Sequence, residues 1–192
     1  MITIIVCLLF NILIIQCFST YTDQECNDMK KIDFTKNYLL TIIKDNSSAL
    51  QCVNNKFKDD YDFILDVVTN NGIALQFVNN TLKSEYYIQL AAVTNNGLAL
   101  QFINDEFLDD AFFDDAFFKD ASFHDNFLNS TFFNEEFFYY QPLNGIFKDY
   151  IGIVLAATNQ NNNAFKFAHN KLKKHCYLGD DKKIYLNSHQ KN

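Results

Sequence analysis

The sequence predicts an all-α fold, built from stacked short helical hairpins. The segment Val68–Asn79 (VTNNGIALQFVN) returns almost unchanged as Val93–Asn104 (VTNNGLALQFIN), which defines a 25-residue period. Apolar residues inside each copy follow helical spacing, and an Asn-Gly pair separates two such runs. A fixed period of this length is typical of repeat arrays, in which each unit buries its apolar face on its neighbours.

The period extends beyond these two copies. Large apolar residues open successive units at the same spacing, except for one longer step from Phe107 to Phe147. The recurring positions are Asn46, Asn71, Asn96 and Asn161; Ala49, Ala74, Ala99 and Ala164; Leu40, Leu65, Leu90 and Leu155; and Cys52, Phe77, Phe102 and Phe167.

The first helix of a unit is expected to begin near Asp59, Ser84 or Asp149, with Thr35 as the near-equivalent in the first unit. Side-chain oxygens of these residue types accept the unpaired N–H groups of a first helical turn. In the second unit, the apolar stripe of this helix is Phe63, Ile64, Val67 and Val68. Such a stripe is typical of a helix packed on one face.

The pair Asn71-Gly72 is expected to end this helix, because glycine readily takes the left-handed conformation that stops a helix. A second helix is expected from about Ile73 to Asn80, with Ala74, Phe77 and Val78 toward the core. A helix of two to three turns is marginal alone and must be held by packing.

The N-terminal stretch Ile2–Phe18 is almost entirely apolar, and small residues precede a cleavage position after Ser19. We therefore expect a signal peptide at 1–19 and a secreted or luminal protein. No Lys or Arg precedes the apolar stretch, which departs from the usual signal pattern. The alternatives are an uncleaved membrane anchor and a buried core helix. The expected organisation then has a lead-in at 20–31, a helical repeat domain at 32–175 and a polar tail at 176–192.

An insert at 108–146 interrupts the repeat domain with a period of five, and the motif Asp-Asp-Ala-Phe-Phe occurs twice in succession. A five-residue step would carry the Phe pairs around every face of a helix, so one amphipathic helix is a poor description. We expect a degenerate helical hairpin enlarged by duplication. A pentapeptide β-helix and an acidic, aromatic loop without regular order are the alternatives.

After removal of a signal peptide, Cys26, Cys52 and Cys176 remain. Cys52 replaces a recurrent Phe, so we interpret it as a packed core thiol, and we expect any disulfide to join Cys26 to Cys176 in an oxidising compartment. Three N-x-S/T triplets are candidate glycosylation sites. They begin at Asn46, Asn79 and Asn129.

The charge pattern and the motifs exclude several classes of function. The formal net charge is −7, and no basic stripe suits a nucleic-acid backbone. The chain contains no nucleophile elbow, phosphate loop, zinc-protease helix or Cys-x-x-Cys pair. His175-Cys176 has no second pair to complete a metal site. We therefore expect no catalytic residue, no metal and no cofactor. An enzyme of unrecognised type is kept as a further hypothesis about the function, after the two given below.

One set of polar residues is a candidate partner-binding surface, because repetition would align its members along the stack. The set is Gln51, Gln76, Gln101 and Lys166, with Asn54, Asn79, Asn104 and His169 three positions further on. A plain solvated face is the alternative interpretation. No partner is identified by the sequence.

At the Asn-Gly-x-Ala-Leu positions the chain resembles the DUF4116 family, a repeat domain of unknown function. The matching stretches are Asp59–Leu82 and Ser84–Phe107, and more loosely Asn37–Phe57 and Asp149–Leu172. The resemblance implies a helical repeat fold and supplies no activity. We expect a non-catalytic binding protein, with a membrane-tethered surface protein as the alternative if the N-terminal helix is retained.

Overall fold

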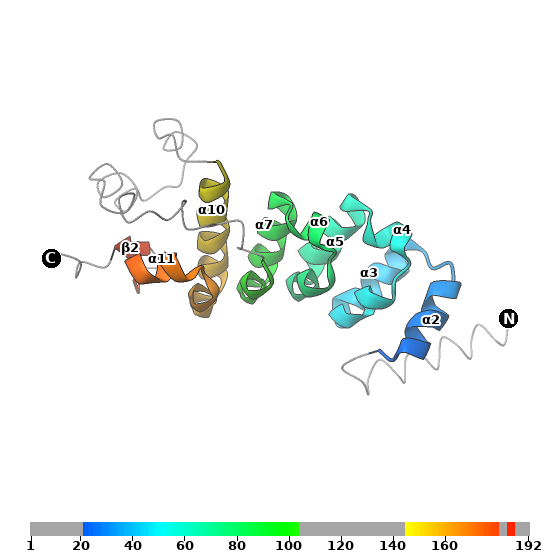
Figure 1. Ribbon diagram of the computed structural model, residues 1–192. Coiled ribbons are helices and arrows are strands. Elements are labelled where there is room, and N and C mark those ends of the chain that lie inside the picture. Colours follow the sequence, from blue (N-terminus) through cyan, green and yellow to red (C-terminus); the bar gives the residue numbers. More distant parts are fainter. Residues whose placement is uncertain (1–20, 104–144, 181–183, 187–192) are drawn as a thin grey trace.

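The computed structural model describes residues 21–103, 145–180 and 184–186. Its helices form an elongated row from the N-terminal to the C-terminal end (Figure 1). The predicted all-α class is confirmed, because helices dominate the described residues and the strands are few and short. The proposed signal peptide at 1–19 and residues 108–144 of the insert lie outside the described residues.

The repeat units can be named by their helices, where η denotes a 3-10 helix. The helix α2 (Asp23–Lys31) precedes the repeats. Unit 1 contains α3 (Lys36–Asp45), η1 (Ser47–Cys52) and α4 (Asn55–Lys58). Unit 2 contains α5 (Tyr61–Asn70), η2 (Gly72–Phe77) and α6 (Asn80–Lys83), and unit 3 contains α7 (Tyr86–Asn95) and η3 (Gly97–Phe102). The last unit contains α10 (Gly145–Gln160), η5 (Asn162–Phe167) and α11 (Asn170–His175).

The first helices of units 1 to 3 begin near the positions that the sequence predicts, although in unit 3 the residue before α7 is Glu85 rather than Ser84, and its side chain makes no capping hydrogen bond. The Thr35 hydroxyl accepts from the backbone N–H of Tyr38, which caps α3 as expected. In unit 2 the cap is Asp60 rather than Asp59, so α5 begins one residue later than the expected start would give. The predicted stripe on α5 is fully buried, and this burial is the main source of the helix's stability.

The predicted second helix is wrong in type and in extent. The backbone from Gly72 to Phe77 forms a 3-10 helix, whose hydrogen bonds span three residues, as from the Ala74 N–H to the Asn71 carbonyl at 3.0 Å. The chain then extends at Val78, and Asn79 caps the separate short helix α6. Two short elements therefore replace the one continuous helix expected at 73–80.

The expected left-handed stop at Asn71-Gly72 is also wrong. Asn71 is extended, with φ −147°, and Gly72 does not have a left-handed φ. Glycine is required there by close packing instead. A Cβ on Gly72 would lie well under 3.0 Å from the carbonyl oxygen of Ala92, on the first helix of the next unit.

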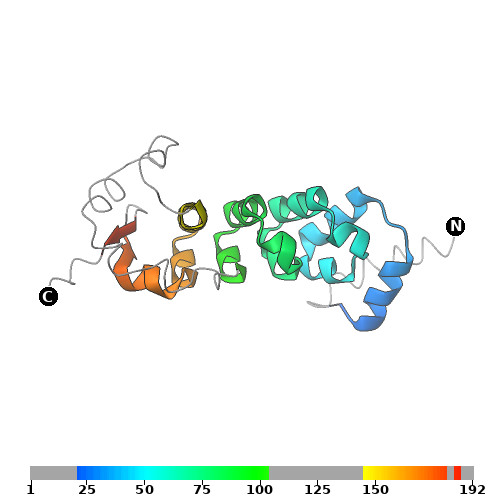
Figure 2. The ribbon, with the colours of Figure 1, turned by 45° about the horizontal axis from the view of Figure 1, so that its top comes forward.

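The units stack side by side, and the stack includes the last unit. The helix α7 packs on α5 and on α10, and the 3-10 helices η1, η2, η3 and η5 contact one another in that order. Figure 2 shows the same succession from a second direction. The recurrent alanines form the interior of the stack, because Ala49, Ala74, Ala99 and Ala164 are all completely buried. The last unit therefore docks directly on unit 3.

The last unit differs from the others at both ends. Its first helix, α10, begins at Gly145 rather than near Asp149 and continues without the break that separates α6 from α7. After α11, strand β1 (Cys176–Leu178) pairs antiparallel with β2 (Ile184–Leu186). The side chains of Cys176 and Ile184 are buried against the core. The expected polar tail at 176–192 therefore begins with a packed hairpin, because its apolar positions complete the end of the stack.

Candidate functional site

The candidate partner-binding residues on the 3-10 helices lie along the stack, as the repeat predicts. We call Gln51, Gln76, Gln101 and Lys166 the polar row. They occupy equivalent positions on η1, η2, η3 and η5, which lie next to one another. Gln76 is half-buried and the other three are exposed. The polar row is thus a continuous accessible feature that crosses the joint between unit 3 and the last unit.

A set of lysines lies beside the polar row and was not singled out from the sequence. The ammonium group of Lys58 donates to the Gln51 carbonyl, and that of Lys83 donates to the Gln76 carbonyl at 3.2 Å. In the last unit, Lys173 donates to the Lys166 carbonyl at 2.8 Å. The sequence pattern that could have identified them is their recurrence, because these three lysines share one position of the repeat.

These lysines have a structural role and also place positive charge next to the polar row. Each satisfies a carbonyl near the end of a 3-10 helix, where no backbone partner follows. Partial burial lowers the pKa of both the Lys58 and Lys83 ammonium groups from the ordinary lysine value. The surface therefore combines amide groups with cations, although the whole chain is acidic.

The second part of the predicted set is engaged in local structure. The Oδ1 atom of Asn54 accepts from the Lys56 N–H and caps α4, and that of Asn79 accepts from the Leu82 N–H and caps α6. The His169 N–H donates to the Tyr150 hydroxyl at 2.7 Å. Asn104 lies outside the described residues. Capping accounts for the recurrence of asparagine at this position.

The predicted pairing of Cys26 with Cys176 is wrong. A disulfide joins Cys26 to Cys52, whose Cα atoms are 4.3 Å apart. The helix α2 packs on η1 at the N-terminal end of the row, whereas Cys176 starts β1 near the opposite end (Figure 1). Cys176 is a free, buried thiol, and burial raises its pKa to about 12. The interpretation of Cys52 as a packed thiol was correct for its burial and wrong for its chemistry.

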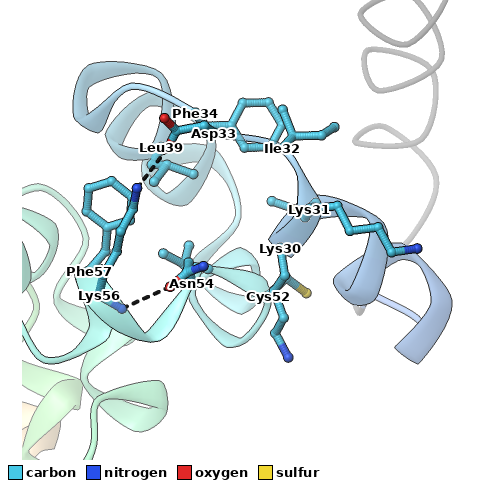
Figure 3. Close-up of a pocket in the computed structure, with 12 residues that line it drawn as sticks. Lys30, Lys31, Ile32, Asp33, Phe34, Leu39, Cys52, Asn54, Lys56 and Phe57 are labelled. Carbon is cyan, nitrogen blue, oxygen red and sulfur yellow. Dashed lines mark hydrogen bonds and ion pairs between the residues drawn. The ribbon is translucent and has the colours of Figure 1, made fainter.

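A pocket of about 160 Å³ lies between the segment after α2 and the junction of η1 with α4. Figure 3 shows Asp33 paired with Lys56 at its edge, where the Lys56 ammonium lies 2.7 Å from the carboxylate. Leu39, Val53 and Phe57 contribute apolar surface. Ligand pockets usually enclose about 300–1,000 Å³, so this space is small for an organic ligand.

Neither a cluster of metal-ligating side chains nor a membrane-spanning helix is found among the described residues. No three or more His, Cys, Asp or Glu side chains gather there in a way that could hold a metal ion. Among the helices of the same residues, none combines the length and apolar character needed to cross a membrane. Asn46 and Asn79, the two candidate glycosylation sites within this part of the chain, both cap helices, and Asn129 lies outside it.

Comparison with known proteins finds one family that is similar to part of the chain. Residues 35–83 match the sequence profile of a family described as "Domain of unknown function (DUF4116)". This match supports the resemblance of residues 35–83 to the DUF4116 family. The DUF4116 match begins at Thr35, the cap of α3, and ends at Lys83, the last residue of α6, so it covers units 1 and 2. No curated protein and no solved structure matches the chain.

Proposed function

We propose that this protein is a non-catalytic helical-repeat binding protein, secreted or held in the lumen of the secretory pathway. The observation that carries the proposal is the polar row, which runs without interruption over η1, η2, η3 and η5. Extended surfaces of stacked repeats are suited to protein partners, because successive units present equivalent groups at a regular spacing. A protein segment that lies across several units is therefore the proposed ligand.

The disulfide supports the proposed compartment. Disulfides persist in the secretory pathway and outside the cell, and they are rare where thiols are kept reduced. The Cys26–Cys52 bond follows shortly after the apolar leader predicted at 1–19. Both features are consistent with entry of the chain into an oxidising compartment.

The alternative is a membrane-tethered surface protein that keeps the apolar stretch Ile2–Phe18. A membrane-spanning helix usually needs ~20 apolar residues, and this stretch falls slightly short, so a thinned or tilted fit would be required. Sequencing of the N-terminus of the natural protein distinguishes the two. Thr20 as the first residue supports secretion, and an intact leader in a membrane fraction supports tethering.

Site-specific photocrosslinking tests the binding surface. A photoreactive phenylalanine analogue is placed at Gln101, and in a control protein it is placed at Thr69, an exposed position on α5. Each protein is irradiated in medium from the cells that produce the natural protein, and the crosslinked adducts are compared. We expect a discrete adduct from position 101 that is lost when Gln76→Glu is added. The exposed-site change Thr94→Glu should leave the adduct intact. An adduct that forms equally from both positions, or that survives Gln76→Glu, contradicts the proposal.

A further inference from the structure

The two N-x-S/T triplets within the described residues differ in what their asparagine amides do. One is Asn46-Ser47-Ser48, at the junction of α3 and η1, and the other is Asn79-Asn80-Thr81, at the start of α6. An N-linked glycan is attached to the side-chain nitrogen Nδ2. The hydrogen bonds of Nδ2 in the folded protein therefore decide whether a glycan can remain there without loss of structure.

The Nδ2 group of Asn79 is fully occupied. It donates to the carbonyl oxygen of Lys58 at 3.1 Å and to Oδ1 of Asp59 at 3.0 Å. Both acceptors lie at the end of α4, so these bonds tie unit 1 to unit 2 while Oδ1 of Asn79 caps α6. A glycan on this nitrogen would remove one of the two N–H donors and place a sugar between the units.

The Nδ2 group of Asn46 donates to no acceptor among the described residues, whereas its Oδ1 accepts from both the N–H and the hydroxyl of Ser48, at 3.0 and 2.7 Å. At the equivalent position one unit later, Asn71 Nδ2 donates to the Ile43 carbonyl of the preceding unit at 2.9 Å. Asn46 belongs to unit 1, and no repeat precedes this unit within residues 21–103 to supply such an acceptor. The Asn46 side chain is also partly exposed.

We infer that Asn46 is the site of an N-linked oligosaccharide in the folded protein and that Asn79 remains unmodified. This inference rests on the proposed passage through the secretory pathway. In the transfer, Nδ2 forms a bond to the anomeric carbon of a lipid-diphosphate oligosaccharide, the bond from that carbon to the diphosphate breaks, and Nδ2 gives up one proton. At Asn46 the lost proton was in no hydrogen bond, and the cap through Oδ1 is kept.

The test uses the full chain, expressed in a eukaryotic cell with N-glycosylation and carrying Asn129→Gln, which removes the third triplet. Folded protein from the medium is treated with an N-glycosidase, and each site is read by peptide mass spectrometry. We expect one glycan, at Asn46. Ser48→Ala should abolish it while leaving Asn46 in place, whereas Asn79→Gln should leave its occupancy unchanged.

Secreted protein that carries a glycan at Asn79, or that has a bare Asn46, overturns the inference and leaves the proposed compartment intact. A chain that stays in the cytosol with residues 1–19 attached overturns both. Ser48→Ala is used in place of Asn46→Gln, because Asn46→Gln would also remove the cap of η1 and could misfold. In Ser48→Ala the backbone N–H at position 48 still donates to Asn46 Oδ1.

Discussion

The Gly97 N–H donates to Oε1 of Gln160 at 2.7 Å, across a sequence separation of 63. One unit earlier, the Gly72 N–H donates to Oδ1 of Asn95 at 2.8 Å, across a separation of 23. The two separations differ by the same amount as the positions of Phe107 and Phe147, which bound the long step of the repeat. The same contact thus joins unit 2 to unit 3 and unit 3 to the last unit, so the stack is continuous despite that long step in the sequence.

Close packing at the glycines of this contact is expected to be essential. A Cβ on Gly97 would lie well under 3.0 Å from the carbonyl oxygen of Ala157, and backbone cannot move aside as a flexible side chain can. Gly97→Ala should lower the free energy of unfolding by about 1–3 kcal/mol, as overpacking of a well-filled interior does. Chemical denaturation measures the change.

The matched control for that substitution is Gly152→Ala, inside α10. A Cβ there would have only the Tyr86 hydroxyl nearby, at an ordinary 3.7 Å. Alanine is favoured over glycine in a helix interior by about 0.5–1 kcal/mol, so this variant should gain stability. A loss at Gly152 comparable with that at Gly97 would show that the close approach to Ala157 is not the cause.

Removal of residues 105–144 should preserve the fold of the stack. The deletion joins Asn104 to Gly145 and restores the regular spacing of the repeat, so that Gly145 takes the position that Asn80 has in unit 2. Size-exclusion chromatography and thermal unfolding followed by circular dichroism should show a monomeric, helical protein with one cooperative transition. An unfolded variant, or separate melting of its two parts, would mean that the deleted residues hold the joint together.

The disulfide should make a large contribution to stability at the N-terminal end. No residue of α2 is fully buried, so apolar packing alone holds this helix weakly. Cys26 and Cys52 are separated by 26 in sequence, and closing a loop of this size stabilises a fold by about 3 kcal/mol in the chain-entropy description. Reduction should lower the free energy of unfolding by that order. Cys176→Ala should keep the same drop on reduction, whereas a variant lacking Cys26 should show none.

The buried Cys176 thiol predicts a loss of stability at high pH. Burial raises its pKa from 9.0 to about 12, so the unfolded chain ionises at a lower pH than the folded one. This contribution is fully present below pH 9 and disappears as the pH rises toward 12. Between pH 8 and 11 the stability of the wild type should therefore fall by about 1–3 kcal/mol more than that of Cys176→Ala. Parallel pH profiles for the two proteins would contradict the prediction.

The repeat made much of the fold predictable from the sequence. The recurring positions identified the four units, the Thr35 cap and the buried column of Ala49, Ala74 and its equivalents. These features depend on local capping and on apolar spacing, which the sequence displays directly. The polar row was predictable for the same reason, because equivalent positions of a stacked repeat must align.

Other features depend on which distant segment approaches, and local sequence does not show this. An Asn-Gly pair fits a left-handed helix stop as well as a close contact, and only the position of Ala92 decides between them at Gly72. Cys52 likewise replaces a core Phe, so its partner became clear only from the packing of α2 on η1. Side chains such as Lys83 were overlooked because surface lysines are usually solvated.

Hydrogen exchange at the Gly97 amide, followed by NMR, tests the continuous stack most directly. If the last unit docks on unit 3, Gln160→Ala should accelerate exchange at Gly97 and leave the Gly72 amide protected. Asn95→Ala should do the reverse, because each amide has its own acceptor. Exchange at Gly97 that is unchanged by Gln160→Ala would contradict the stack across the insert.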